Sequence, residues 1–589
     1  MKESTYVRFR RLCAALGVGL LALTGLLLLL SLHPTPALAD PGTLFVAPDG
    51  TGTACTQGNP CSLQTALAQA TDGDTIYVAT GTYTGTGAAV ITVTQSITLY
   101  GGWDGSPTGP VVRDPDAYPT TLDGENGRRV VYISGSITPT VDGFNITGGN
   151  ADGLGGDYWE WDAGGGVYVI TATATIRNNQ VFSNIAERGG GLYLYTSPAT
   201  LSGNTIISNS GERSAGGLFL YRSNATLSDN AVISNSTGGD GGGLYLSYSD
   251  NATLSSNIFD GNTAGAHGGG LYLYGSAVLS SNTIISNTAN KRGGGLCLYS
   301  GNATLSGNTV ASNTANEWGG GLFIYGASPT LVNNIIADNR ANIAGSGLYI
   351  WTASPRLQHT TIARNSGGDA SGVHVSHVTG SSTVVLDNTI LVSHTVGITV
   401  TAGDSASLEA TLWGSGAWAN TTDWGGDGTI LTGTVNIWGD PAFVDPDGGD
   451  YHIGPDSAAI DAGVDVGVTT DIDGEARPNG PGYDIGADEF YCYALTDVDI
   501  TGPVTGTTGT AYVFTATVAP PTATLPITYT WSPQPDAGQS GPVVTYTWAT
   551  AGTKAITVTA ENCGGVVSDT HAITIWGYVY LPLVVRDYP

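Results

Sequence analysis

Between residues 164 and 375, hydrophobic positions recur with a long and steady period. A glycine-rich step precedes a short strand-like run, and the first aliphatic residue of that run returns at intervals of 25 to 27 residues. These markers are Val167, Leu192, Leu218, Leu244, Leu271, Leu296, Leu322, Leu348 and Val373. A single unit of this length cannot bury its own apolar side, so successive units must stack. The pattern therefore predicts a solenoid.

The second half of each unit specifies the kind of solenoid. A leucine or equivalent is followed by asparagine three residues later and by another asparagine after five more, as in Leu201, Asn204 and Asn209. No helical periodicity separates the short β-favouring runs, so each unit is predicted to be one coil of a parallel β-helix. The two columns read Asn179, Asn204, Asn230, Asn257, Asn282, Asn308, Asn334 and Thr360, then Asn184, Asn209, Asn235, Asn262, Asn287, Asn313, Asn339 and Asn365. We expect both columns to be buried hydrogen-bonded ladders.

The paired Gly-Gly-aliphatic and aliphatic-x-x-Asn steps resemble those of right-handed parallel β-helix proteins of bacterial surfaces. Residues 189–192 and 206–209 carry one such pair, and residues 319–322 and 336–339 carry another. The resemblance implies an all-β fold with a right-handed parallel β-helix of about 26 residues per coil. It leaves activity open, because the same architecture hosts adhesins, pectin-degrading enzymes and passive surface proteins.

Strand parity predicts which side chains face the core. The markers and the residues two positions later are uniformly aliphatic, so both columns should point inward. The intervening columns are rich in aromatic residues and should form two ladders on an outer sheet. They contribute sheet stability, at about 0.2 to 1 kcal/mol per stacked pair, or else a platform for an extended glycan. The candidate platform residues are Tyr193, Tyr195, Tyr221, Tyr245, Tyr272, Tyr274, Tyr299, Tyr325, Tyr349 and Trp351.

The sequence before and after the repeats divides into further regions. Residues 1–39 carry basic residues, an apolar run and a small-residue cleavage site, which predicts a secretory signal, with an uncleaved anchor as the alternative. Residues 40–85 should cap the solenoid with a helix that starts at Ser62 and a first strand at 73–78. The β-helix is expected over 86–395, irregular coils over 396–490, a β-sandwich over 491–576, and a tail with a possible sorting role over 577–589.

The negative net charge of the chain limits the classes of molecule that it can bind. The chain has 19 Lys and Arg against 48 Asp and Glu, a net charge of -29, and removal of the signal leaves about -32 by the same counting. This acidity excludes nucleic-acid binding. With 41% hydrophobic residues, the chain is not a disordered acidic tail.

The segment from Asp440 to Glu489 is similar to the choice-of-anchor Q domain of secreted bacterial β-helix proteins, which implies surface attachment. Asp471, Asp473 and Asp484 in this segment could offer oxygen ligands to Ca²⁺. Their spacing departs from a calcium loop, so turn capping by aspartate is favoured. We assign no metal or cofactor: Ca²⁺ is possible but unsupported.

Residues 491–576 contain short alternating strands and resemble a PKD-type immunoglobulin-like module. Cys492 and Cys563 of this module are expected to form a disulfide, and so are Cys55 and Cys61 near the N-terminus. Disulfides indicate an oxidising compartment. Cys297 is left alone within an aromatic column.

These observations predict a secreted or cell-surface, monomeric β-helix protein that acts as a structural or adhesive module. Its expected partner is extracellular polysaccharide or cell envelope, and its mature form should not span a membrane. No nucleophile and base stand in a fixed relation, so no catalytic residue is assigned. The alternative is a polysaccharide lyase or glycoside hydrolase on the same fold, using acids of the irregular coils between residues 100 and 165. These acids are Asp104, Asp114, Asp116, Asp123, Asp157, Glu160 and Asp162.

Overall fold

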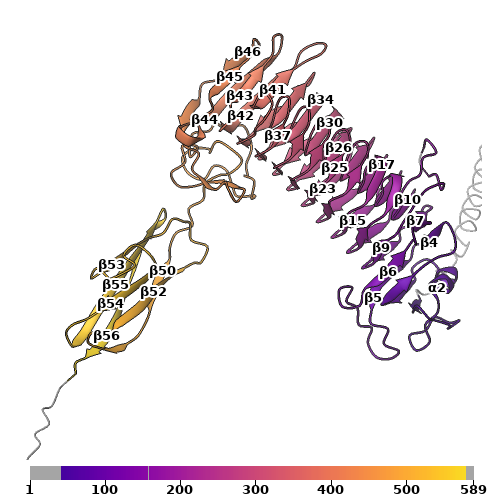
Figure 1. The fold of residues 1–589 in the computed structure, drawn as a ribbon, viewed down its shortest axis with the longest axis horizontal. Coiled ribbons are helices and arrows are strands. Elements are labelled where there is room, and N and C mark those ends of the chain that lie inside the picture. Colours follow the sequence, from indigo (N-terminus) through magenta and orange to yellow (C-terminus); the bar gives the residue numbers. More distant parts are fainter. Residues whose placement is uncertain (1–41, 157, 579–589) are drawn as a thin grey trace, which may run out of the picture.

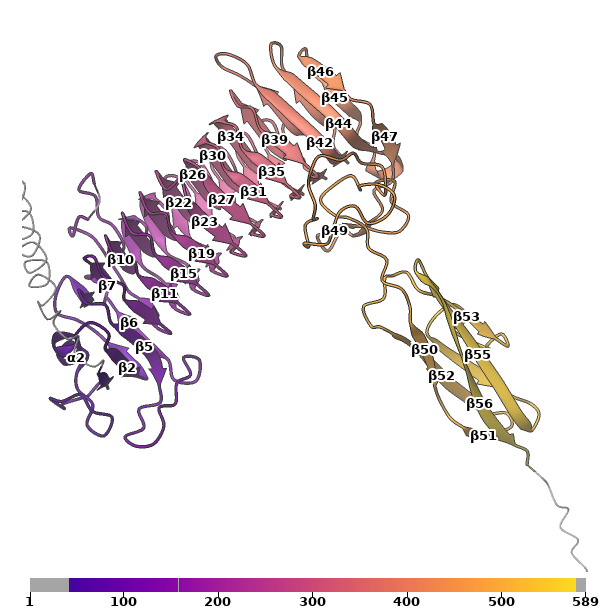
Figure 2. The same cartoon turned by 180° about the vertical axis from the view of Figure 1, so that it is seen from behind.

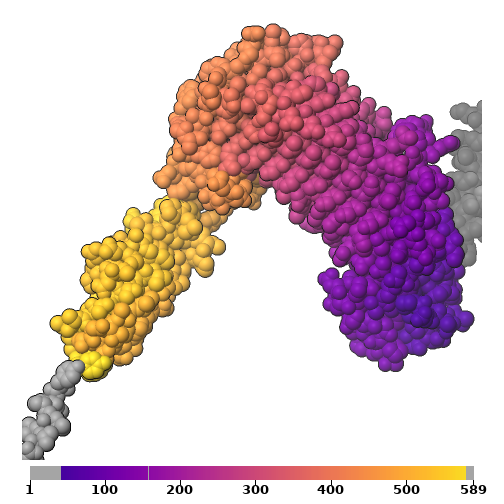
Figure 3. Space-filling view, in the orientation of Figure 1, coloured from indigo at the N-terminus to yellow at the C-terminus, as the bar shows by residue number. Residues whose placement is uncertain are grey.

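The computed structural model describes residues 42–156 and 158–578. A long β-solenoid is followed by irregular loops and then by a separate small β domain (Figures 1 and 2). Figure 3 shows the solenoid as one continuous body, with the small domain joined beyond its C-terminal coils. The predicted signal segment and residues 579–589 of the predicted tail lie outside the described residues.

One coil illustrates the repeat. Strands β14 (Leu192–Tyr195), β15 (Thr200–Ser202), β16 (Thr205–Ile207) and β17 (Ser210–Ser214) follow one another round the solenoid. The chain then enters β18 (Leu218–Tyr221), which pairs in parallel with β14 so that Leu192 lies beside Leu218. The 26-residue interval therefore equals one turn of the solenoid, as the sequence predicts.

Successive coils build three long sheets of 27, 13 and 7 strands. The 13-stranded sheet carries the marker residues and the aromatic columns. Its strands are β4 (Ala89–Val93), β7 (Arg129–Ser134), β10 (Val167–Ile170), β14, β18, β22 (Leu244–Ser247), β26 (Leu271–Tyr274), β30 (Leu296–Gly301), β34 (Leu322–Ala327), β38 (Leu348–Trp351), β41 (Ser371–Ser376), β43 (Val396–Val400) and β45 (Thr422–Gly425).

The core is a continuous aliphatic column along the solenoid axis. Leu192 and Leu194 point inward from the 13-stranded sheet and meet Leu201 and Ile206 from the 27-stranded sheet, and all four are fully buried. Each such side chain contributes about 1.5 to 3 kcal/mol when it is removed from water. The predicted inward direction of the aliphatic columns is confirmed.

Both asparagine columns are buried ladders, as predicted. The Asn204 side-chain amide donates to Oδ1 of Asn230 in the next coil at 2.9 Å and to the carbonyl of Ile176 in the preceding coil at 2.8 Å. The backbone N–H of Asn204 donates to the same Asn230 oxygen. A lone asparagine at this corner would leave buried groups unpaired, whereas the column pairs them coil by coil.

The corners impose backbone constraints that explain the residues around each asparagine. Gly203 and Ser208, which precede the two asparagines of one coil, have φ of 62° and 55°, in the left-handed region that glycine and short polar residues tolerate best. In the glycine-rich step, a Cβ on Gly190 would lie 2.1 Å from the Ser210 carbonyl oxygen. The Gly-Gly marker therefore reflects close packing of neighbouring chain segments.

The N-terminal cap contains the predicted helix, α2 (Leu63–Gln69), whose N-cap Ser62 accepts a hydrogen bond from the Thr65 N–H. Leu63 packs into the end of the solenoid core. The prediction that the strand after the helix is the first of the solenoid is wrong. A shorter strand, β1 (Thr43–Val46), precedes the helix and pairs with β2 (Thr75–Ala79). The first coil needs a neighbour for β2, and the chain ahead of the helix provides it. Cys55 and Cys61 form the predicted disulfide.

Beyond the regular coils, β42 (Thr383–Val392) and β44 (Ser405–Gly414) extend the large sheet, and loops up to residue 490 cover its outer side. The C-terminal domain is a β-sandwich of a three-stranded and a four-stranded sheet. Its strands are β50 (Asp497–Thr501), β51 (Thr505–Thr507), β52 (Ala511–Ala519), β53 (Thr528–Ser532), β54 (Val543–Thr547), β55 (Gly552–Asn562) and β56 (Gly565–Trp576). Cys492 and Cys563 are bonded, as predicted.

Within residues 42–156 and 158–578, no helix combines the length and the apolar character needed to cross a membrane.

Removing one rung of an asparagine ladder should be costly. In Asn235→Ala, the N–H and side-chain amide of Asn209 lose their shared acceptor and the Ile206 carbonyl loses its donor. Because each buried group left unpaired costs roughly 1 to 3 kcal/mol, we expect the free energy of unfolding to fall by about 2 to 5 kcal/mol in denaturant titrations. The exposed Asn290→Ala is the control, and an equal loss in both variants would contradict a ladder role.

The second ladder continues through a histidine, which predicts acid sensitivity. Asn365 donates to Nε2 of His394, while Nδ1 of His394 faces Asn420 Oδ1, so the neutral ring takes the place of an asparagine. Burial lowers the pKa of His394 to about 4. The unfolded chain thus binds a proton near the ordinary value of about 6.5 that the folded chain does not bind.

Stability conferred by neutral His394 is therefore complete above pH 6.5 and is lost as the pH falls towards 4, by up to about 1.4 kcal/mol per pH unit. We expect His394→Asn to reduce the difference in unfolding free energy between pH 7 and pH 5, measured by chemical denaturation. An unchanged pH dependence in this variant would argue against the ladder histidine as its source.

Candidate functional site

The outer face of the 13-stranded sheet carries two parallel columns of mostly aromatic side chains. The inner aromatic column comprises Tyr168, Tyr193, Phe219, Tyr245, Tyr272, Cys297, Phe323, Tyr349 and His374. The outer aromatic column comprises Ile170, Tyr195, Tyr221, Ser247, Tyr274, Tyr299, Tyr325, Trp351 and Ser376. Their register follows directly from the parallel pairing of the strands that carry them.

The inner aromatic column is a tightly stacked and largely buried layer. The Phe219 ring lies 5.0 Å from Tyr193 and 4.7 Å from Tyr245, with nearly parallel planes. Burial raises the pKa of Tyr245 and of Tyr272, so these phenols stay neutral. This column therefore stabilises the sheet and offers little free surface.

Side chains from the turns before the strands help to bury the inner aromatic column, which the alternation of inward and outward strand residues does not predict. In three coils, the residue four positions before the marker lies over a ring of the neighbouring coil. The guanidinium carbon of Arg188 lies 5.3 Å from the Phe219 ring centre, and that of Arg292 lies 5.2 Å from Phe323. Trp318 covers Tyr349 in the same manner, at 5.7 Å between ring centres. The two arginine contacts are favourable cation–π interactions, and all three side chains shield the rings from water.

The outer aromatic column remains partly accessible. Its rings at Tyr195, Tyr274, Tyr299, Tyr325 and Trp351 are half-buried. Ser247 interrupts the column, and Tyr248 from the following turn fills the gap. The Tyr248 ring makes edge contacts with Tyr221 at 5.8 Å and with Tyr274 at 5.2 Å. Tyr248 is 52% exposed, so it extends the accessible aromatic surface.

A loop adds three more rings to this face. Tyr158, Trp159 and Trp161, here called the aromatic loop, precede β10 and fold onto the outer column. Tyr158 stacks on Tyr221 at 6.4 Å, and Trp159 meets the same ring edge-on at 5.4 Å. Tyr158 is 61% exposed and Trp159 is 45% exposed. Together with Tyr248 they form an exposed group of rings around Tyr221, here called the ring platform.

Arginines hold the aromatic loop in place. The Arg188 guanidinium carbon lies 3.8 Å from the Trp161 ring centre, and Arg213 approaches the same ring at 4.7 Å. Arg222 lies over Tyr221 at 5.3 Å. These contacts place hydrogen-bond donors beside the apolar ring faces, which is the combination that a sugar surface requires.

A cleft of about 520 Å³ lies beside the base of the same loop. Tyr132, Tyr168 and Ile170 line it from the sheet, and Leu154 lines it from the loop. Arg129 lies at the cleft, and its Nε donates to the Ala163 carbonyl at 2.8 Å. The cleft and the ring platform thus occupy neighbouring parts of one sheet face.

The predicted platform residues divide into two groups. Tyr193, Tyr221, Tyr272 and Tyr349 are buried, whereas Tyr195, Tyr245, Tyr274, Tyr299, Tyr325 and Trp351 are half-buried. Of the two interpretations of the columns, sheet stability fits the inner one better, because side chains from neighbouring turns cover much of it. Sequence reasoning did not identify Tyr248 or the aromatic loop. Three aromatic residues within positions 158–161 of a polar loop are the signal that could have pointed to them.

The acidic residues of the alternative enzymatic hypothesis serve mainly as turn caps. Asp104 accepts from Ser106, Asp114 from the N–H groups of Asp116 and Ala117, and Asp123 from the Glu125 N–H. Asp157 lies outside the described residues. Asp162 accepts from Gly153 and Gly155, and it borders a cavity of about 270 Å³ that Asp152, Glu187 and Glu212 also line.

The three aspartates considered for Ca²⁺ do not converge. Asp471 accepts from the N–H groups of Asp473, Glu475 and Glu489. Asp484 accepts from the N–H groups of Asp461 and Phe490. The predicted capping role is confirmed for Asp471 and Asp484. Asp473 faces a different set of residues around His452.

Comparison with known proteins agrees with this architecture. Residues 125–289 and 242–412 match the family model of the right handed beta helix region, and residues 498–575 match that of the PKD domain. The segment similar to choice-of-anchor Q lies between these matches, and its assignment stays a prediction. No curated protein matches the chain.

Among solved structures, the crystal structure of pectate lyase Pel9A aligns with 12% identity and a TM-score of 0.33, covering 77% of this chain and 98% of that chain. A likeness at this level has no bearing on activity. Fold and family matches together identify the chain as an all-β protein, with a right-handed parallel β-helix followed by a small β domain that matches PKD.

Proposed function

We propose that this protein is a secreted, surface-associated structural or adhesive module that binds polysaccharide on the outer face of its 13-stranded sheet. The observation that carries the proposal is the ring platform: Tyr158, Trp159 and Tyr248 gather around Tyr221 and remain exposed. A contiguous group of exposed apolar side chains marks an interaction surface. Tyrosine and tryptophan match a sugar ring by combining an apolar face with a polar edge.

The ladder beyond the ring platform fits an extended ligand. Half-buried rings continue from Tyr274 through Tyr299 to Tyr325, with neighbouring centres 5.8 and 4.8 Å apart. A linear polymer can contact such a row at several points, and each point adds to retention without requiring a deep pocket. We therefore propose an extended polysaccharide as the ligand and not a small molecule.

Net charge favours an uncharged polysaccharide. With a formal net charge of -29, the protein repels polyanions over distances comparable to the Debye length. The arginines near the platform already contact aromatic rings, as Arg188 and Arg213 do on Trp161. A neutral glycan needs no additional cations for recognition.

The proposed location outside the cell rests on separate features. Two disulfides and the PKD match are typical of oxidising, extracellular surroundings. The predicted signal at residues 1–39 and the choice-of-anchor Q resemblance of residues 440–489 point the same way. We propose that the protein acts there as a monomer, with the β-sandwich as a spacer.

A second candidate function is hydrolysis or lysis of a polysaccharide. The cavity lined by Asp152, Asp162, Glu187 and Glu212 favours it, because paired carboxyl groups are the usual machinery of glycoside cleavage. Glu187, however, accepts from Arg213 at 2.8 Å and from the Asp162 N–H at 3.0 Å. The hydrogen bond from Arg213 lowers the pKa of Glu187. A carboxylate with a lowered pKa suits a structural role better than that of a general acid.

Removing the exposed rings should weaken retention. In Trp159→Ala combined with Tyr248→Ala, we expect binding to insoluble neutral polysaccharides to weaken at least tenfold, because about 1.4 kcal/mol corresponds to tenfold in affinity. Trp576→Ala is the matched control, since Trp576 is exposed in the β-sandwich far from the platform. Co-sedimentation measures retention. Equal retention by the double variant and the control would refute the platform.

Incubation with a polysaccharide panel separates the two candidate functions. For a binding module we expect retention without new reducing ends or unsaturated products. Depolymerisation that is lost in Glu187→Gln but retained in Trp576→Ala would favour the enzyme. Product analysis by size-exclusion chromatography with a reducing-end assay provides the measurement.

A further inference from the structure

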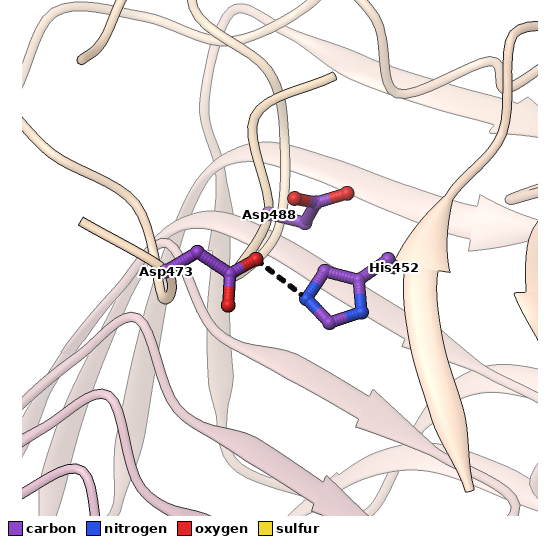
Figure 4. Close-up of side chains that lie close together, drawn as sticks. All are labelled: His452, Asp473 and Asp488. Carbon is purple, nitrogen blue, oxygen red and sulfur yellow. Dashed lines mark ion pairs between the residues drawn. The ribbon is translucent and has the colours of Figure 1, made fainter. Parts of the chain in front are cut away.

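The loops that cover the C-terminal coils bring together an imidazole and carboxylates from three separate segments. His452 lies on β49 (Asp450–Ile453), Asp473 lies in the turn after Asp471, and Asp488 lies in the stretch that closes this region (Figure 4). One ligand-type atom from each of these three residues lies within 4.8 Å of the others. The group is therefore compact enough to surround one ion.

The imidazole is oriented as a metal ligand requires. Nδ1 of His452 lies 2.6 Å from Asp450 Oδ1, so Asp450 can hold the proton on Nδ1 and leave a lone pair on Nε2. Nε2 faces Asp473 Oδ2 at 2.8 Å. This nitrogen is shielded from solvent, so a proton or a cation is needed to join it to the Asp473 oxygen. Nε2 and Oδ2 cannot present lone pairs to each other at this distance, so the arrangement suits a bound cation when Nε2 carries no proton.

Asp488 supplies an independent indication of a ligand. It is 7% exposed, and one of its oxygens accepts the Ile453 N–H at 2.7 Å. In the described part of the chain, no Lys or Arg forms an ion pair with Asp450, Asp473 or Asp488. Three carboxylates thus share one imidazole, that of His452, and this excess of negative charge around the buried Asp488 favours a bound cation.

The surrounding structure fixes the positions of these groups in advance. Asp471 accepts the N–H groups of Asp473 and Glu475 and so holds the turn that carries Asp473. The buried Arg477 donates to Glu489, the neighbour of Asp488, at 2.8 Å. A cavity of about 310 Å³ borders the group and is also lined by Tyr491, Tyr493 and Leu525. Solvent and ions can therefore reach the group from this side.

We propose that His452, Asp473 and Asp488 form a binding site for a divalent first-row transition cation of the zinc class, with Asp450 as the positioning residue for His452. One imidazole with two carboxylates is a donor set that suits Zn²⁺ and its neighbours, whereas Ca²⁺ prefers six to eight oxygens. The cation joins the β49 hairpin, the 471–474 turn and the 484–489 segment next to the β-sandwich. This site is independent of the proposed glycan face.

The test uses the purified full protein after treatment with a chelator. Titration with ZnCl₂ in a calorimeter should give one saturable site, and Zn²⁺ should raise the midpoint of thermal unfolding. We expect His452→Gln to weaken binding at least 100-fold and Asp450→Asn to weaken it 10- to 100-fold, since Asp450 acts only through the imidazole. His377→Gln is the matched control, because Nδ1 of His377 contacts Asp404 in the same way at 2.9 Å within the solenoid.

X-ray absorption of Zn²⁺ bound to the unaltered protein should show a mixed nitrogen and oxygen shell, a result that does not depend on the variants folding. An all-oxygen shell, tighter binding of Ca²⁺ than of Zn²⁺, the absence of a saturable Zn²⁺ site, or equal affinity of His452→Gln and His377→Gln would each overturn the proposal.

Discussion

In-register stacking of identical corners is the constraint on which the rest of the molecule depends. At each corner a buried asparagine accepts from one coil and donates to others: Asn209 accepts from Asn184 and donates to Asn235 and to the Val181 carbonyl. A slip of one residue would place these amides in the aliphatic core and the leucines outside. Stacked coils therefore share one register, and this register aligns the side chains of every outer column as well.

The same register gathers aromatic rings on the outer face of the 13-stranded sheet, whether or not they bind a ligand. Once Leu192 and Leu194 must face inward, Tyr193 and Tyr195 must face outward, and repetition stacks them on their counterparts in the next coil. What distinguishes the two columns is the turn that precedes each strand. It brings Arg188, Arg292 or Trp318 over the inner column and leaves the outer column partly open.

The sequence predicts those features of the fold that recur in every coil, and it predicts the features that occur once less completely. The coil length, the inward leucines, both asparagine ladders and the two disulfides follow from spacing and parity. The burial of Tyr193 and Tyr272 does not follow, because strand parity gives the direction of a side chain but not what packs over it. The strand at Thr43–Val46 was missed because it is short and lies outside the repeat.

Sites capable of specific recognition require a break in the repeat. A uniform column presents the same surface at every coil. It can therefore bind a ligand anywhere along its length but cannot select one binding position. The aromatic loop and Tyr248 break the uniformity near Tyr221, and the loops after residue 440 break it at the C-terminal end. In the latter, side chains far apart in sequence, such as His452 and Asp488, meet without a symmetric counterpart in the next coil. The regular solenoid thus acts as a rigid support, and its interruptions hold the chemically distinctive groups.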